Sequence, residues 1–230
     1  MAERRQDTTR RSAGASAGRE YKRRRAIRDA RVRRRFGSLG VAVAHLLGDP
    51  DSTRAWKQGA DGELRAGSQL ARHLRGRRVV LLHDRRIPGR GRANIDHMTI
   101  GAGGITVIDS KSARGRVQVK KVGGPFSARR ELLLVNGRDR TCVLDGIERQ
   151  IDAVRRAVAG LDLGDVDVRG ALCYPNIDRR PPVGQLRTPA GLIAIDRPRG
   201  VAKLARRQGK LDSELVRQIG QELARRFPPA

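Results

Sequence analysis

Apolar residues recur along the chain at two periods, one typical of β-strands and one typical of α-helices. The patterning begins near residue 59, and Gly- and Pro-rich segments separate the patterned stretches. The order of elements predicts an α/β fold with a mixed sheet flanked by helices. The expected helices span 60–75, 145–159, 199–207 and 212–227, and the expected strands span 78–83, 95–100, 105–111, 117–122, 131–135, 168–174 and 191–195.

The strands at 95–100 and 105–111 flank a Gly-rich segment and are typical of a β-hairpin with a four-residue loop. In that register Asp96 lies directly across from Asp109. Lys111 shares a face with Asp109 because side chains alternate along a strand. Opposed like charges on neighbouring strands cost roughly 0.2–1 kcal/mol. A divalent cation between the two carboxylates would remove that repulsion.

Glu63 adds a carboxylate from the helix expected at 60–75. It shares a helix face with Gly67, Leu70 and Leu74, a face that otherwise points inward. Acidic side chains are rarely buried without a partner. Two interpretations stay open, a role at a metal site and a place in the first helical turn, where a carboxylate favours the positive end of the helix dipole.

The chemistry of these residues indicates phosphodiester hydrolysis. Oxygen ligands from Asp96, Asp109 and Glu63 select Mg²⁺ or Mn²⁺ over zinc. A bound metal screens phosphate charge and lowers the pKa of its water, while Lys111 can orient that water or stabilise the pentacovalent anion. The alternative for Lys111 is a solvated lysine at a strand end. Alternation points His97 away from the Asp96 face, as expected of a packing residue.

Three motifs carry a resemblance to a known family. Gly62-Glu63, Ile95-Asp96-His97 and Ile108-Asp109-Ser110-Lys111 resemble the motifs of the nuclease-related domain, or NERD, family over roughly residues 57–160. That family is assigned to the restriction-endonuclease-like superfamily of metal-dependent nucleases. The superfamily signature is an Asp followed by Asp/Glu-x-Lys.

The resemblance implies a restriction-endonuclease-like core and a role for each matched residue. Asp96 and Asp109 would be metal ligands, Lys111 the catalytic lysine, and Glu63 an accessory ligand from the first helix. Gln150 resembles a glutamine that many superfamily members carry on the helix after the lysine strand. A structural amide and a contact to phosphate or base are both open for Gln150.

The charge of the chain indicates a polyanionic partner. Lys and Arg number 50 against 24 Asp and Glu, a formal net charge of +26, and cations that neutralise phosphates release condensed counterions. A GC-rich genome that inflates Arg is the alternative explanation. The first 35 residues alone hold fourteen Lys and Arg against four acids, which is too polar to bury a core.

That basic segment is either a solvated tail or a nucleic-acid-binding arm. The arm would be disordered or, from about 20 to 36, a helix formed against phosphate. The expected organisation is an arm at 1–56, a nuclease-related α/β domain at 57–197 and C-terminal helices at 198–230. The expected nucleic-acid contacts are Arg23, Arg24 and Arg25 in the arm, Arg90 and Arg92 in the Pro88–Arg92 loop, and Gln150.

Composition also bears on the cellular compartment of the protein. Cys142 and Cys173 lack metal-site spacing, and no run approaches the 18 apolar residues of a membrane span. A cytoplasmic protein, with nucleoid association as a further option, is therefore expected. The leading hypothesis is a Mg²⁺- or Mn²⁺-dependent nuclease that cleaves DNA, or RNA, with low sequence specificity. The rival is a non-catalytic nucleic-acid-binding protein on the same fold; the sequence does not indicate an oligomeric state.

Overall fold

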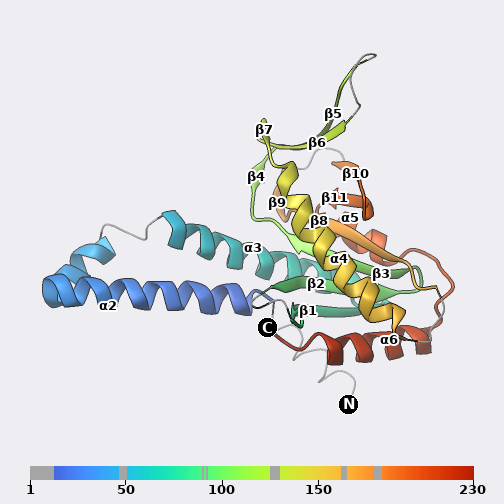
Figure 1. The fold of residues 1–230 in the computed structure, drawn as a ribbon, viewed down its shortest axis with the longest axis horizontal. Coiled ribbons are helices and arrows are strands. Elements are labelled where there is room, and N and C mark those ends of the chain that lie inside the picture. Colours follow the sequence, from blue (N-terminus) through green and yellow to red (C-terminus); the bar gives the residue numbers. More distant parts are fainter. Residues whose placement is uncertain are drawn as a thin grey trace.

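A six-stranded mixed sheet forms the centre of the molecule, with helices on both faces (Figure 1). The computed structural model describes residues 13–46, 51–89, 91, 93–124, 130–161, 165–178 and 183–230. Strand order in the sheet is β1-β2-β3-β8-β11-β10. The expected α/β class, a mixed sheet flanked by helices, is confirmed. None of the helices in these ranges is long and apolar enough to cross a membrane.

The main sheet consists of β1 (Val80–Arg86), β2 (Asn94–Gly101), β3 (Gly104–Ser110), β8 (Val168–Cys173), β10 (Gly184–Thr188) and β11 (Gly191–Asp196). Smaller sheets are formed by β5 (Val117–Val122), β6 (Arg130–Val135) and β7 (Arg138–Asp139), and by β4 (Arg114–Gly115) with β9 (Asn176–Ile177). The helices are α2 (Ala15–Leu46), α3 (Asp51–Leu74), α4 (Leu144–Ala159), α5 (Pro198–Ala205) and α6 (Ser213–Arg226), with a 3₁₀ turn at Thr141–Val143.

The hairpin of β2 and β3 has the expected register but a shorter loop. Ile100 pairs with Ile105, and the pairing continues to Gly101 and Gly104, which leaves a two-residue turn instead of four loop residues. The tight turn requires glycine because Gly104 has a φ of 104°. β1 and β2 are also antiparallel, whereas β3, β8 and β11 run parallel.

Alternating side chains of β3 bury against different helices. Val107 lies in the cluster that α4 and α6 cover, together with Ile147 and Ile151 of α4. Ile108 lies in the cluster that α3 and α5 cover, together with Leu70. Full burial of one such aliphatic side chain contributes about 1.5–3 kcal/mol. The two clusters fix α3 and α4 on opposite faces of the strand that ends at the candidate site.

Helix α2 runs alongside α3 and is longer than the 20–36 helix that the sequence offered as an option (Figure 1). It contains ten Lys and Arg and two acids. Glu20 accepts hydrogen bonds at 2.8 Å from Arg23 and Arg24, which lie three and four residues later on the same helix face. Such pairs support helices with little apolar surface.

The beginning of the basic segment packs on the domain, beside α3. Ala13 and Ala17 are 3% and 6% exposed. Gly67 of α3 accommodates this packing, since a Cβ there would lie 2.8 Å from that of Ala13. Helix α3 runs without a break across residues 56 and 57, where the boundary between arm and domain was expected.

Several boundaries also differ from expectation. α3 begins nine residues early, since 51–59 is helical without a periodic apolar face. β1 continues to Arg86 through charged residues that the apolar pattern did not mark. β10 and the two-residue strands were not expected at all.

Candidate active site

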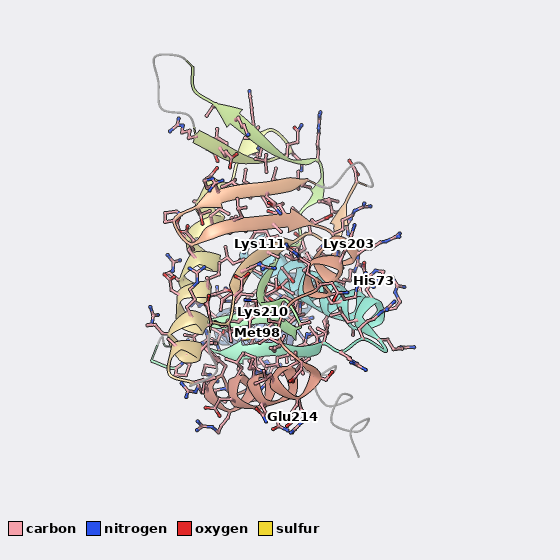
Figure 2. The ribbon with its side chains drawn as sticks, turned by 90° about the vertical axis from the view of Figure 1, so that its right-hand side faces the viewer. His73, Met98, Lys111, Lys203, Lys210 and Glu214 are labelled. Atoms are coloured by element: carbon pink, nitrogen blue, oxygen red, sulfur yellow. The ribbon has the colours of Figure 1, made fainter. Side chains whose placement is uncertain are left out.

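The ends of β2 and β3 bring the expected acid and lysine residues together. The Ser110 backbone N–H donates to Asp96 Oδ2 at 2.7 Å, which places the Asp96 side chain against the end of β3. Lys111 Nζ lies 2.9 Å from Oδ1 and 2.7 Å from Oδ2 of Asp109. The Lys111 N–H donates to the Cys173 carbonyl of β8, so the backbone that carries the lysine is held by the sheet. Figure 2 shows Lys111 well above Met98, the buried residue two positions after Asp96.

Glu63 faces this cluster from the interior of α3. It lies twelve residues after the first residue of the helix, so the interpretation that places it in the first turn is wrong. Its Oε2 is buried and has no hydrogen-bond partner in the described part of the chain. Burial first, and then repulsion by Asp84 and Asp109, raise the pKa of Glu63 to about 7, against the opposing effect of Lys111.

The pKa values of Asp96 and Lys111 are shifted as well. Burial raises the pKa of Asp96 well above its ordinary value, and the nearby Glu63 and Asp109 raise it further. Burial alone would lower the pKa of Lys111, but the carboxylate of Asp109, helped by Asp96 and Glu63, outweighs this and keeps it above its ordinary value. The cluster is therefore a buried group of carboxyl side chains in which Asp96 and Glu63 retain a proton more readily than usual, beside the Lys111–Asp109 ion pair.

Asp84 belongs to this region, and the sequence reasoning missed it. It lies opposite Asp96 in the β1–β2 register, between the pairs His83–His97 and Arg85–Ile95. Its backbone has a φ of 47°, and its side chain is 1% exposed. The available signal was an acid continuing an apolar strand pattern, at a residue type that tolerates left-handed conformations.

Three donors converge on the Asp84 carboxylate. The Ser16 backbone N–H donates to Oδ2 at 2.8 Å, and the Ser16 hydroxyl donates to Oδ1 at 2.7 Å. Asn94 Nδ2 donates to Oδ1 at 2.8 Å. The carbonyl of Asp84 accepts from the N–H of Ala230 at 2.9 Å. This residue therefore joins the start of α2, the β1–β2 end and the C-terminal segment beside the acid cluster.

Two buried histidines lie beneath Asp96 and Glu63. His83 Nδ1 and His97 Nδ1 are 2.8 Å apart, so one nitrogen donates and the other accepts. The rings meet edge to face, with centroids 4.8 Å apart. Burial lowers the pKa of both residues, that of His83 to about 4. His97 is fully buried, as expected for a packing residue.

The donor set fits a hard divalent cation in part. Asp96, Asp109 and Glu63 offer carboxylate oxygens, and the buried Glu63 Oε2 without a partner is the kind of atom that a cation would satisfy. Among the described residues, no three His, Cys, Asp or Glu side chains form a group that could hold one metal ion. The arrangement therefore suits an ion that takes one or two carboxylates and keeps water ligands, as Mg²⁺ does. The individual ligands remain a prediction.

The remaining predicted contacts are Gln150 on α4 and five arginines. Gln150 is half-buried on α4, and its Oε1 has no hydrogen-bond partner in the described ranges. Arg23 and Arg24 pair with Glu20, and Arg25 Nη1 donates to the Tyr21 hydroxyl at 3.4 Å. Two further candidates, Arg90 and Arg92, lie outside the described residues.

Comparison with known proteins agrees with the geometry. The model of the family described as Nuclease-related domain matches residues 58–175, which is 118 of 230 residues and just over half of the chain. The match includes Glu63, Asp96, Asp109, Lys111 and Gln150. No curated protein and no solved structure matches the chain. The chain thus belongs to the nuclease-related domain family, and its function is nuclease-related.

Proposed function

We propose that this protein is a Mg²⁺- or Mn²⁺-dependent nuclease that hydrolyses phosphodiester bonds in DNA with low sequence specificity. The observation that carries the proposal is the Lys111–Asp109 pair, with the lysine within 2.9 Å of both carboxylate oxygens, beside Asp96 and Glu63. A lysine held this way can stabilise negative charge that develops on a phosphate. RNA is the alternative substrate.

Asp96 and Asp109 would hold the cation, with Glu63 as an accessory ligand. When bound, the cation supplies charge neutralisation at the phosphate and a more acidic water. Lys111 Nζ remains next to the Asp109 carboxylate, where it can orient a water molecule or donate to a phosphate oxygen. The backbone N–H of Ser110 keeps Asp96 against β3.

The overall charge supports nucleic acid as the substrate. A net charge of +26 favours phosphate contacts, which carry no sequence information. Only 3% of the residues are aromatic, so few side chains can stack on bases. Low sequence specificity is the expected consequence.

The decisive test is cleavage of plasmid DNA by wild type and two charge-neutralising variants. Asp109→Asn removes the carboxylate that Lys111 contacts, whereas Asp167→Asn removes an acid with the same two-residue spacing to its own partner, Arg169. Asp167 is a suitable control because its carbonyl accepts from Ile105, at the other end of β3. Wild type and Asp167→Asn should cleave with Mg²⁺ or Mn²⁺ and stop with EDTA.

Asp109→Asn should lose about a hundredfold or more in rate, and so should Lys111→Met if its charge stabilises the transition state. Equal cleavage by wild type and Asp109→Asn would identify a contaminating nuclease and defeat the proposal.

A melting experiment tests the cation without relying on activity. A ligand that binds only the folded state at about 100 times its Kd stabilises it by about 2.7 kcal/mol. Mg²⁺ or Mn²⁺ should therefore raise the Tm of wild type and of Asp167→Asn but not that of Asp109→Asn. The same Tm shift in all three proteins would contradict Asp109 as a ligand.

A non-catalytic nucleic-acid-binding protein on this fold is the second candidate. It is favoured by the absence of a three-ligand metal group among the described residues and by the occupation of both Asp109 oxygens by Lys111. DNA binding without cleavage under any of these cation conditions would establish it.

A further inference from the structure

A cavity of about 640 Å³ opens beside Glu63, between the first turns of α2, the β1–β2 end and the C-terminal segment. Residues on both sides of the 58–175 family match form its walls. The lining residues are Ser16, Ala17, Arg19, Glu20, Arg23, Arg24, Glu63, Arg86, Gly91, Asn94 and Ala230.

Asp84 holds the walls of this cavity in place. Ser16 from α2 and Asn94 from β2 both line the cavity, and both donate to the Asp84 carboxylate. Asn94 Nδ2 also donates to the Ser16 hydroxyl at 3.0 Å. Arg19 donates to the carbonyl of Ala230 across the same opening. The cavity is therefore a built feature, fixed by hydrogen bonds among three distant parts of the chain.

The cavity is rich in guanidinium groups. Four arginines and two glutamates line it. Arg23 Nε and Nη2 each lie 2.8 Å from a Glu20 oxygen, so that fork is already ordered before a ligand arrives. Arg86 is exposed at the end of β1. Planar guanidinium forks match the oxygen geometry of phosphate.

A second cavity of about 410 Å³ lies at a neighbouring part of the α3 surface. Gly62 lines it, while the next residue, Glu63, lines the first cavity. Arg65 and Arg114 contribute positive charge there, and Ser112 follows directly after Lys111. Both cavities thus offer arginines to phosphates, one on each side of Glu63.

We propose that the first cavity binds the phosphates of one nucleic-acid strand, so that the substrate reaches the acid cluster as a single-stranded end, flap or melted segment. This inference rests on the proposed function and names its substrate class. Arg23 and Arg86 contact the strand through its phosphates, and Glu63 marks where the strand passes toward Asp96 and Asp109.

Size favours one strand over a duplex. Taken as a sphere, the cavity would be about 11 Å across, which is less than the roughly 12 Å width of the major groove of B-DNA alone. Among the residues that the structure describes, no aromatic side chain lines the cavity to stack on a base. The strand is therefore held by its backbone, and the binding does not depend on base sequence.

The test is the salt dependence of binding in EDTA, where no metal-dependent cleavage interferes. The probes are a fluorescent oligo-dT strand and a relaxed, covalently closed circular duplex, which has neither ends nor unpaired loops. Each phosphate contact contributes about 0.7 to the slope of log K against log salt on a single strand. Arg23→Gln and Arg86→Gln should each weaken binding of oligo-dT severalfold and flatten its slope by about that amount.

Arg217→Gln is the matched control. Arg217 pairs with Glu214 three residues earlier on α6, as Arg23 pairs with Glu20, and the two arginine side chains are 53% and 50% exposed. Figure 2 shows Glu214 at the end of the molecule away from Lys111. Binding by this variant should match wild type, and all three variants should bind the closed duplex as wild type does.

Two results would overturn the inference. One is an unchanged slope on oligo-dT for Arg23→Gln and Arg86→Gln, or an equal change for Arg217→Gln. The other is an equal loss on the closed duplex, which would mean that the cavity does not select a single strand. Because binding is measured without cleavage, an inactive wild type with the expected slopes would refute only the nuclease proposal. An active wild type with unchanged slopes would refute only this inference.

Discussion

Replacing Asp84 with Asn tests whether one buried carboxylate holds the start of α2 to the domain. The substitution preserves the size of the side chain, and Asn tolerates the φ of 47° at this position. It removes the negative charge and exchanges one acceptor oxygen for an NH₂ group. The backbone is therefore left unstrained, and any loss of stability reports the hydrogen bonds.

The expected loss of folding stability in Asp84→Asn follows from the three hydrogen bonds that this carboxylate accepts. The amide oxygen can still accept from the Ser16 hydroxyl and from Asn94, but the new NH₂ group faces the Ser16 N–H, which donated to Oδ2 at 2.8 Å. Loss of a hydrogen bond to a charged group costs about 1.5–3 kcal/mol. Loss of the Asp84 charge relieves its repulsion of Glu63 and offsets part of this. A net loss of about 1–2 kcal/mol is expected.

Urea unfolding measures this loss as a lower midpoint at an unchanged m-value. Ser16→Ala should also be destabilised, because the hydroxyl both donates to Asp84 and accepts from Asn94. Ser68→Ala is the control, since the Ser68 hydroxyl donates to the Arg65 carbonyl one turn earlier, on the exposed side of α3. A wild-type midpoint for Asp84→Asn would refute the claim that this carboxylate anchors the segment.

Two further predictions concern the buried histidine and the hairpin turn. Because burial lowers the pKa of His83 to about 4, while the unfolded chain takes up a proton near 6.5, the contribution of neutral His83 to stability should be constant above pH 6.5 and fall by up to about 3 kcal/mol toward pH 4. The raised pKa of Glu63 acts in the opposite direction, so the His83 contribution is measured as the difference between wild type and a variant. In urea unfolding, His83→Gln should gain up to about that amount relative to wild type between pH 6.5 and pH 4, and the less buried His73→Gln should gain less; a constant difference between wild type and His83→Gln would contradict the assignment. Gly104→Ala should cost more than about 2 kcal/mol, because its φ is 104° and a Cβ would overlap the Asp167 carbonyl oxygen. Gly146→Ala, in open space within α4, should instead add up to about 1 kcal/mol in the same measurement, and similar effects of the two changes would refute the argument.

The hairpin register was predictable because two local signals agree. Alternating apolar residues fix which face each side chain takes, and the Gly-rich turn fixes where the strands reverse. Together they placed Asp96 across from Asp109 and set Lys111 on the same face. The loop length was wrong by one pair, since Gly101 pairs with Gly104, but extending the ladder in the same register moves no side chain to the other face.

The contacts that the sequence did not reveal are those between distant segments. Ser16 and Asp84 are 68 residues apart, and no local pattern links the two positions. A helix as basic as α2 carries no signal for what it packs against, and the turn that precedes it approaches α3 through small residues, Ala13 against Gly67. Sequence periodicity identifies faces that bury apolar surface, whereas these segments are joined by hydrogen bonds and close backbone approach.

Asp84, Asp96 and Asp109 stand at adjacent positions across three neighbouring strands, yet their charges are balanced very differently. Asp84 accepts three hydrogen bonds, and Asp109 pairs with Lys111. Asp96 receives one backbone N–H, and its pKa is raised well above the ordinary value, like that of Glu63. A row of acids selected for stability alone would carry partners at each position. Asp96 and Glu63 are therefore the two acids that ionise least readily here, and a cation bound at this site would favour their ionised forms and lower both pKa values.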